Sequence, residues 1–202
     1  LHNVCNHSDL REPYEAALEM LNIYQLEVSQ NKVLYHLIEN IEKDPHFHSL
    51  DKAKQKVVEN YLLDFKLSGV HLSDDMKKVY LETQQQLSKF STEFQNHLLD
   101  ATQAWSLNIQ EESQLAGIPS HTLDIARENA KNNNQKGFLF KLDFPTYQSI
   151  VTYAEQRSLR EIFYKAYITR ASELNVDYPQ YDNTQIMNEI LKLRQKIATL
   201  LS

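Results

Sequence analysis

The hydrophobic positions between Ser73 and Trp105 recur at alternating steps of three and four residues. They are Met76, Tyr80, Thr83, Leu87, Phe90, Phe94, Leu98, Ala101 and Trp105. This spacing places them on one face of an α-helix, opposite a face of Lys, Glu, Gln and Ser. At about 1.5 Å per residue the helix spans roughly 48 Å. Because a helix of that length cannot bury its apolar face alone, we expect this face to be core and other helices to pack along it.

Shorter amphipathic segments flank this long helix, and capping or helix-breaking residues separate them. We expect helices over about 9–30, 31–43, 49–69, 111–116 and 121–131, and further helices beginning near Pro145, Ser158 and Thr184. The apolar face of the first contains Tyr14, Ala17, Leu18, Leu21, Tyr24 and Val28. Ser49 is a predicted N-cap, and Gly69 is predicted to end its helix. The short link after Gly69 predicts that this third helix and the long one form a helical hairpin.

Two stretches have the alternating pattern of β-strands, at about 106–110 and 137–144. In the second, Phe138, Phe140, Leu142 and Phe144 are expected on one side, and Leu139, Lys141 and Asp143 on the other. A two-stranded sheet is marginal in water, so it must pack against helices. The predicted fold class is therefore mostly α: antiparallel helical hairpins in a bundle, one long helix over 73–105, and a small antiparallel pair of strands.

The composition limits the class of partner. The chain has 202 residues, 42% of them hydrophobic, which suits one large domain or one lobe of a larger protein. It has 21 basic and 27 acidic residues, a formal net charge of −6. A mildly acidic chain with mixed signs indicates neither nucleic acid nor an anionic membrane as a partner. No apolar run approaches the roughly 18 residues of a membrane span.

The beginning of the chain indicates a reducing compartment. Cys5 is the single cysteine, so an internal disulfide is excluded, and we expect a cytoplasmic protein. The first residues contain no basic region followed by an apolar one, so no signal peptide is predicted. They also lack an initiator Met, and the last helix is still amphipathic at Ser202. We therefore expect this chain to be part of something longer.

The eight histidines raise the question of a metal site. None of them begins a His-Glu-x-x-His motif. His46 and His48 could supply two ligands, but no third and fourth ligand follow at the usual zinc spacing. They are therefore interpreted as loop residues beside Pro45, and His71 and His97 as ordinary, partly exposed residues.

Other reactive patterns also have structural explanations. The acidic pairs Asp74-Asp75 and Glu111-Glu112 suit helix N-termini, which favour negative charge. Three scattered glycines cannot form a phosphate-binding loop, and Ser or Cys nucleophile signatures are absent. One aromatic group could line a surface, although packing is its commoner role: Tyr153, Tyr164, Tyr167 and Arg170. On residues alone, the chain shows no active site.

Several strings together resemble a known family. They are DFKLSGV at 64–70, Leu87-Ser88, Phe94, Asn96, LDAT at 99–102 with Trp105, LAGIP at 115–119, LRE at 159–161 with Tyr164, Ala166-Tyr167 and TRAS at 169–172, Asp182-Asn183, and Ile190-Leu191 with Leu193-Arg194. Each is weak alone, but their order and spacing agree from about Leu10 to Leu201. The chain is thereby identified as similar to the N-terminal segment of the oligopeptidase A and thimet oligopeptidase family of zinc metallopeptidases.

This resemblance implies a helical two-lobed enzyme with a channel that admits short unstructured peptides. One zinc ion would be held by a His-Glu-x-x-His helix and a later Glu, outside this segment, and the motif Glu would activate the metal-bound water. No position here matches a catalytic or metal-binding residue, so we assign none, and substrate-binding residues stay unknown. Residues 1–202 are then expected to be a single N-terminal domain, part of one lobe, with the catalytic zinc domain absent and no cofactor in this chain.

Two functional interpretations follow. In the first, the segment forms part of the substrate channel of a zinc oligopeptidase and is inactive alone; its partners are short peptides, through the whole enzyme, and the missing catalytic lobe. In the second, it is a free-standing helical interaction module without catalytic activity. For the first, we expect an exposed apolar patch around Ile197–Leu201 on the last helix, and self-association of the segment.

Overall fold

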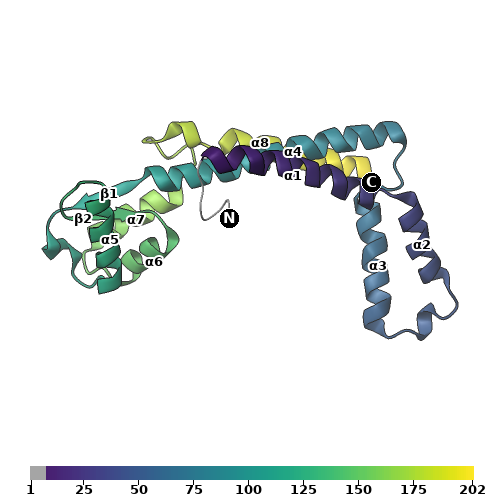
Figure 1. Ribbon diagram of the computed structural model, residues 1–202, viewed down its shortest axis with the longest axis horizontal. Coiled ribbons are helices and arrows are strands. Elements are labelled where there is room, and N and C mark those ends of the chain that lie inside the picture. Colours follow the sequence, from purple (N-terminus) through teal and green to yellow (C-terminus); the bar gives the residue numbers. More distant parts are fainter. Residues whose placement is uncertain (1–7) are drawn as a thin grey trace. The chain divides into compact units, whose positions relative to one another are not determined.

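The structure, a computed structural model, describes residues 8–202, which are mostly α-helical with one short pair of strands (Figure 1). Cys5 lies outside the described residues. The described residues form two compact units, 8–92 with 188–202, and 93–187. The predicted fold class is confirmed, whereas the prediction of a single domain over 1–202 stays a prediction.

The first unit is built from helices alone. It contains α1 (Ser8–Ser29), α2 (Lys32–Lys43), α3 (Lys52–Leu67), most of α4 (Asp74–Ala104), most of α8 (Thr184–Leu201), and the short 3₁₀ turn η1 (Phe47–Ser49). Asn31 caps α2 by accepting hydrogen bonds from the main-chain N–H groups of Val33 and Leu34. The expected cap Ser49 is wrong by two residues: Ser49 lies in η1, and Asp51 caps α3, its carboxylate accepting from Lys54 N at 3.0 Å.

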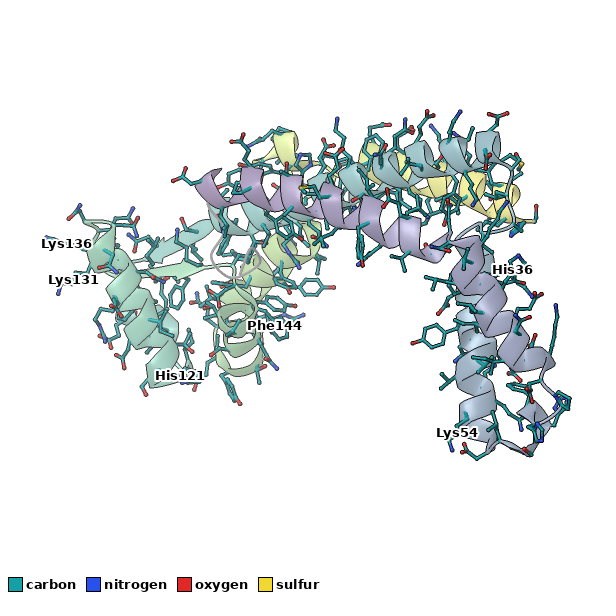
Figure 2. All side chains as sticks on the ribbon, turned by 45° about the vertical axis from the view of Figure 1, so that its right-hand side comes forward. His36, Lys54, His121, Lys131, Lys136 and Phe144 are labelled. Carbon is teal, nitrogen blue, oxygen red and sulfur yellow. The ribbon has the colours of Figure 1, made fainter. Side chains whose placement is uncertain are left out.

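The helical hairpin of this unit pairs α3 with α2, which Figures 1 and 2 show side by side. The connection between them folds back because Phe47 is buried at its tip, and the rings of Tyr35 and Phe65 meet across the hairpin at 5.9 Å. The predicted pairing of α3 with the long helix was wrong. Gly69 does end α3, with a positive φ of 79°, and Val70 and Leu72 of the link after it are buried. The hydroxyl of Tyr80 on α4 donates to Leu67 O at the end of α3.

The apolar face of α4 behaves largely as predicted. Tyr80, Thr83 and Ala101 are buried, and Met76, near the first turn, is exposed. The remaining positions of the face are half-buried: Leu87, Phe90, Phe94, Leu98 and Trp105. Ser73 caps the helix, its hydroxyl accepting from Met76 N at 3.4 Å. The predicted long helix is therefore confirmed as Asp74–Ala104.

Two expected apolar faces were wrong. In α1, Leu18 of the predicted face is half-buried, but Leu21 and Tyr24 are 55% and 63% exposed, and Ile23 and Leu26 are half-buried in their place. On α8, the apolar residues Ile197, Leu200 and Leu201 are half-buried, because this end of the helix packs within the unit and Leu201 reaches the Gly69 turn. Exposed apolar side chains gather on the hairpin: Val33, Leu34, Leu37 and Ile41 of α2, and Val57, Tyr61 and Leu63 of α3.

The second unit contains the strands and the remaining helices. These are β1 (Ser106–Ile109), η2 (Glu112–Leu115), α5 (Ser120–Asn132), β2 (Phe138–Lys141), α6 (Phe144–Tyr153), α7 (Arg157–Thr169) and η3 (Pro179–Tyr181), with the last part of α4 and the first turn of α8. The strands are antiparallel, with Ser106 opposite Lys141 and Ile109 opposite Phe138. As predicted, they pack against a helix, α5, whose Asn129 side chain donates to Leu139 O at 3.3 Å.

The second strand is shorter than predicted. It ends at Lys141, because Asp143 caps α6 through Thr146 N at 2.9 Å and makes Phe144 the first residue of that helix. Phe144 is consequently exposed, and Leu139 is buried like Phe138. The alternating pattern was therefore wrong only about Phe144, which belongs to α6. Leu139 is buried although it alternates with Phe138 and Phe140, because α5 packs against the strands as well.

The core of the second unit centres on Phe163 of α7, which is fully buried. Its ring meets Trp105 at 5.0 Å and Phe140 at 6.0 Å, both edge to face. Ile150 and Leu142 fill the same cluster. Trp105 directly precedes β1 and Phe140 lies in β2, so this one ring holds both strands against α7.

The substitution Phe163→Ala is expected to lower the free energy of unfolding by about 3–5 kcal/mol, because it leaves a cavity that three elements line. Urea unfolding followed by circular dichroism measures the change. Tyr164→Ala is the matched control: its side chain is exposed, and we expect a change within about 0.5 kcal/mol. Equal effects of the two substitutions would contradict this assignment of the core.

Candidate functional site

The histidines and carboxylates form no metal centre in the part of the chain that the structure describes. No group of three or more His, Cys, Asp or Glu residues there could hold a metal ion. His46 Nδ1 lies 3.1 Å from Asp44 Oδ1, and His48 packs edge-on against Phe47. The zinc implied by the resemblance therefore finds no ligand set among residues 8–202, and we derive no catalytic step through it.

His97 is placed by a buried amide. Asn183 is 1% exposed, and its amide nitrogen donates to Phe94 O at 3.1 Å. Its oxygen therefore faces His97 and accepts from Nδ1–H at 3.1 Å. The ring also lies 6.1 Å from that of Tyr181. This arrangement ties α4 to the start of α8, which gives His97 a structural role that its position in the sequence did not reveal.

Asp182, beside Asn183, lies just before α8. Its carboxylate accepts from the hydroxyl and the main-chain N–H of Thr184, at 2.7 and 2.9 Å. These two hydrogen bonds, with a smaller contribution from His97, hold the pKa of Asp182 below its ordinary value of 3.8.

The predicted aromatic group is only partly assembled. Arg170 lies over the ring of Tyr167 at 3.6 Å and donates to the Tyr167 carbonyl. Tyr167 stacks on Tyr147 at 3.9 Å, so these three side chains are packed together. Tyr153 and Tyr164 are exposed and have no recorded ring contact with them in the described chain. The packing interpretation is therefore supported for Tyr167 and Arg170.

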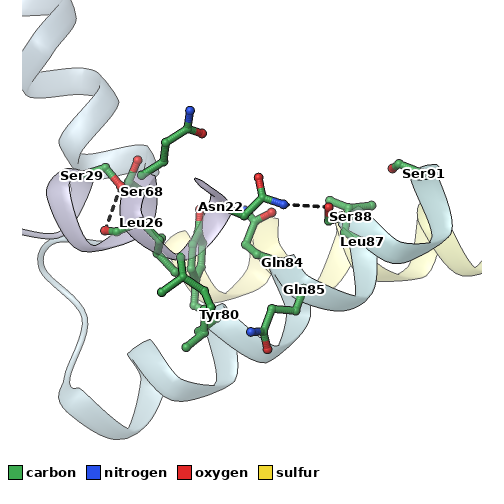
Figure 3. Close-up of a pocket in the computed structure, with 13 residues that line it drawn as sticks. Asn22, Leu26, Ser29, Ser68, Tyr80, Gln84, Gln85, Leu87, Ser88 and Ser91 are labelled. Carbon is green, nitrogen blue, oxygen red and sulfur yellow. Dashed lines mark hydrogen bonds between the residues drawn. The ribbon is translucent and has the colours of Figure 1, made fainter. Parts of the chain in front are cut away.

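The first unit contains a groove between α1 and α4, with a volume of about 410 Å³, shown in Figure 3. Thirteen residues line it: Asn22, Ile23, Gln25, Leu26 and Ser29 of α1, Ser68 at the end of α3, and Tyr80, Leu81, Gln84, Gln85, Leu87, Ser88 and Ser91 of α4. The volume falls within the range of roughly 300–1,000 Å³ that is common for ligand sites. It is the candidate functional site.

Internal hydrogen bonds fix the walls of this groove. Asn22 Nδ2 donates to Ser88 Oγ at 2.8 Å, joining the two helices, as the dashed line in Figure 3 shows. Gln84 Nε2 donates to the hydroxyl of Tyr80, which donates to Leu67 O at 3.2 Å. At the end of α1, Gln30 Nε2 donates to Ser68 O at 2.8 Å. The groove is therefore held by bonds between separate elements.

The chemistry of the lining is polar without charge. Its side chains are four amides, four serine hydroxyls, one tyrosine and four aliphatic groups, and none is Asp, Glu, Lys, Arg or His. Amides and hydroxyls both donate and accept hydrogen bonds. In the described part of the chain, no hydrogen bond is recorded for the side chains of Gln25 and Gln85. The groove can therefore offer paired donors and acceptors to a neutral ligand.

The sequence analysis missed this groove. It assigned the Gln and Ser residues of the long helix to a solvent face. A signal was present: Gln84, Ser88 and Ser91 follow Tyr80 at helical steps on the flank of the apolar face. These residues become one wall of the groove only because α1 lies alongside α4.

Comparison of the sequence with known proteins places it beside one class, the oligopeptidases. Residues 1–77 match a family model described as the N-terminal domain of neurolysin and thimet oligopeptidase. Over 201 residues the chain is 40% identical to oligopeptidase A of Haemophilus influenzae and 37% identical to oligopeptidase A of Escherichia coli; each alignment covers 100% of the chain and 30% of the relative. A probable cytosolic oligopeptidase A of Arabidopsis thaliana is 33% identical over 185 residues, 88% of the chain and 26% of that protein.

The chain therefore spans less than a third of the length of the curated relatives it matches. The resemblance drawn from the ordered motifs is confirmed: this sequence is similar to the N-terminal segment of the oligopeptidase A and thimet oligopeptidase family.

The hydrogen bond between Asn22 and Ser88 should appear as a coupling energy. We expect the cycle of Asn22→Ala, Ser88→Ala and the double variant to give about 0.5–1.5 kcal/mol, measured by urea unfolding. Gln25→Ala with Ser91→Ala is the control pair, because both residues line the groove and no hydrogen bond is recorded between them. A coupling near zero for Asn22 and Ser88 would show that the two helices are not joined there.

Acid should remove the stabilisation that Asp182 provides. Because its pKa is lowered in the folded protein, the stabilisation is complete above the ordinary value of 3.8 and is lost as the pH falls below that value, through the lowered pKa. Asp182→Asn should therefore cost most at neutral pH and progressively less toward pH values below 3.8. Unfolding curves across this window measure the effect, with the exposed Asp177→Asn as control. A cost independent of pH would contradict the assignment.

Proposed function

We propose that this chain is the N-terminal part of a zinc-dependent oligopeptidase of the oligopeptidase A type, which hydrolyses short unstructured peptides. The observation that carries the proposal is the 40% identity that extends over the whole chain while covering 30% of the relative. A free-standing module of different function has less reason to keep such an alignment from end to end.

In this proposal the segment contains no catalytic or metal-binding residue. Residues elsewhere in the protein would hold the zinc ion, which when bound would supply Lewis-acid chemistry for peptide hydrolysis. The absence of a three-residue ligand cluster from residues 8–202 is compatible with this division of labour. The chain alone is therefore proposed to be inactive.

The role left to the segment is to form part of the substrate channel. Its partners are the remaining lobe of the enzyme and, through the whole enzyme, short peptides. Residues 1–202 are proposed to act as one N-terminal domain, in the cytoplasm. The exposed apolar side chains of α2 and α3, such as Val33 and Leu37 at 69% and 57% exposure, provide surface that a larger assembly can cover. No helix within residues 8–202 is both long and apolar enough to cross a membrane.

The division of labour is testable with metal and peptide. The native protein that contains this chain should hydrolyse an internally quenched peptide, lose this activity with a chelator, and recover it with zinc. The 202-residue chain alone should bind no stoichiometric zinc by mass spectrometry under native conditions, and should not hydrolyse the peptide.

Two outcomes would overturn the proposal. One tight zinc ion per isolated chain would place a metal site in this segment. A native protein near 23.7 kDa, detected in cell lysate with an antibody against the chain, would instead support the free-standing interaction module.

A further inference from the structure

We propose that the groove between α1 and α4 binds an extended segment of peptide through its main chain. This inference rests on the proposed function for the class of ligand, a short unstructured peptide. It adds a site that is built from this chain's own residues.

The dimensions of the groove suit a few extended residues. Along α4 the lining runs from Tyr80 to Ser91, and along α1 from Asn22 to Ser29. At about 1.5 Å per helical residue these walls are roughly 10–17 Å long. An extended chain advances about 3.3 Å per residue, so three to five residues fit along the walls.

The hydrogen-bonding groups match a peptide backbone. Each peptide unit offers one N–H donor and one C=O acceptor. The amide side chains of Gln25 and Gln85 offer the same pair, and neither has a recorded partner within residues 8–202. Gln84 uses its nitrogen on Tyr80 and keeps its oxygen as an acceptor. The aliphatic residues Ile23, Leu26, Leu81 and Leu87 supply apolar surface between these groups.

The absence of charge from the lining decides against the other common ligands. A nucleotide, a phosphate or an acidic peptide would be recognised through Arg or Lys, and a metal ion through carboxylates or imidazoles. None of these side chains lines the groove. The lining matches a neutral peptide main chain instead, and recognition through the main chain depends little on sequence, as an enzyme for varied peptides requires.

The walls are also set before a ligand arrives. Asn22 bonds Ser88, and Tyr80, itself buried, anchors Gln84. Because these bonds hold the spacing of the helices, a peptide meets a fixed site and loses less affinity to ordering of the protein.

The experiment measures binding of a labelled peptide to the native full-length protein after its metal has been removed, so that no hydrolysis occurs. The probe is a fluorescein-labelled peptide of Ala, Ser and Gly, about eight residues long, roughly twice the length of the groove. Fluorescence anisotropy gives its dissociation constant. A second probe has the same sequence with N-methylated peptide bonds, which removes main-chain donors and leaves the side chains unchanged.

Gln85→Leu is the test variant, and Gln86→Leu is its matched control, because Gln86 is the next residue of α4, is exposed, and does not line the groove. Gln85→Leu should weaken binding of the first probe about 3-fold to 10-fold, the equivalent of one or two hydrogen bonds. Gln86→Leu should leave the affinity unchanged. N-methylation should weaken binding to the unaltered protein and have a smaller effect on the Gln85→Leu protein. Thermal unfolding of both variants checks that the fold is retained.

Equal affinities of the Gln85→Leu and Gln86→Leu proteins would overturn the inference, and so would equal binding of the two probes to the unaltered protein. Failure of the proposed function has a different signature. In that case the zinc-loaded protein does not hydrolyse peptides, whatever residue stands at position 85.

Discussion

Burial of one face of α4 is the constraint on which the other helices depend. The helix has 31 residues, and its apolar positions must be covered along most of that length. In the first unit, Tyr80 and Thr83 are buried and α1 is joined to the helix by the bond between Asn22 and Ser88. In the second unit, Ala101 is buried and the amide of Asn183 reaches Phe94 O. Local capping sets where each helix starts, and contact with α4 places α1 and the start of α8.

The elements with strong periodic patterns could be predicted from the sequence. The long helix, the positions of the other helices and the antiparallel strands were confirmed because their patterns extend over many residues or end at clear signals such as Ser73 and Gly69. The pairing of helices could not be predicted in the same way. The link after Gly69 is short, yet α3 packs on α2, because Phe47 is buried at the other connection. Periodicity identifies an apolar face but not the element that covers it.

The groove shows why sites without ionisable groups escape analysis of sequence. A search of the sequence for catalytic or metal-binding residues selects His, Cys, Asp and Glu, because their side chains are reactive. Gln84, Gln85 and Ser88 have no such signature, and on an isolated helix they are indistinguishable from residues that simply face water. Their significance depends on a second helix across from them. The exposed apolar residues of α1 show the converse error, since an apolar face was taken to be a covered one.

The position of the single tryptophan has a practical consequence. Trp105 packs edge-on against Phe163 in the second unit, and the first unit has no tryptophan. Tryptophan emission therefore reports the local environment of residues 93–187 alone, whereas the far-ultraviolet circular dichroism signal averages the helices of both units. A denaturation experiment that records both signals at once compares unfolding of the second unit with unfolding of the whole chain. If the two curves coincide, the units unfold together, and if they separate, the units unfold independently.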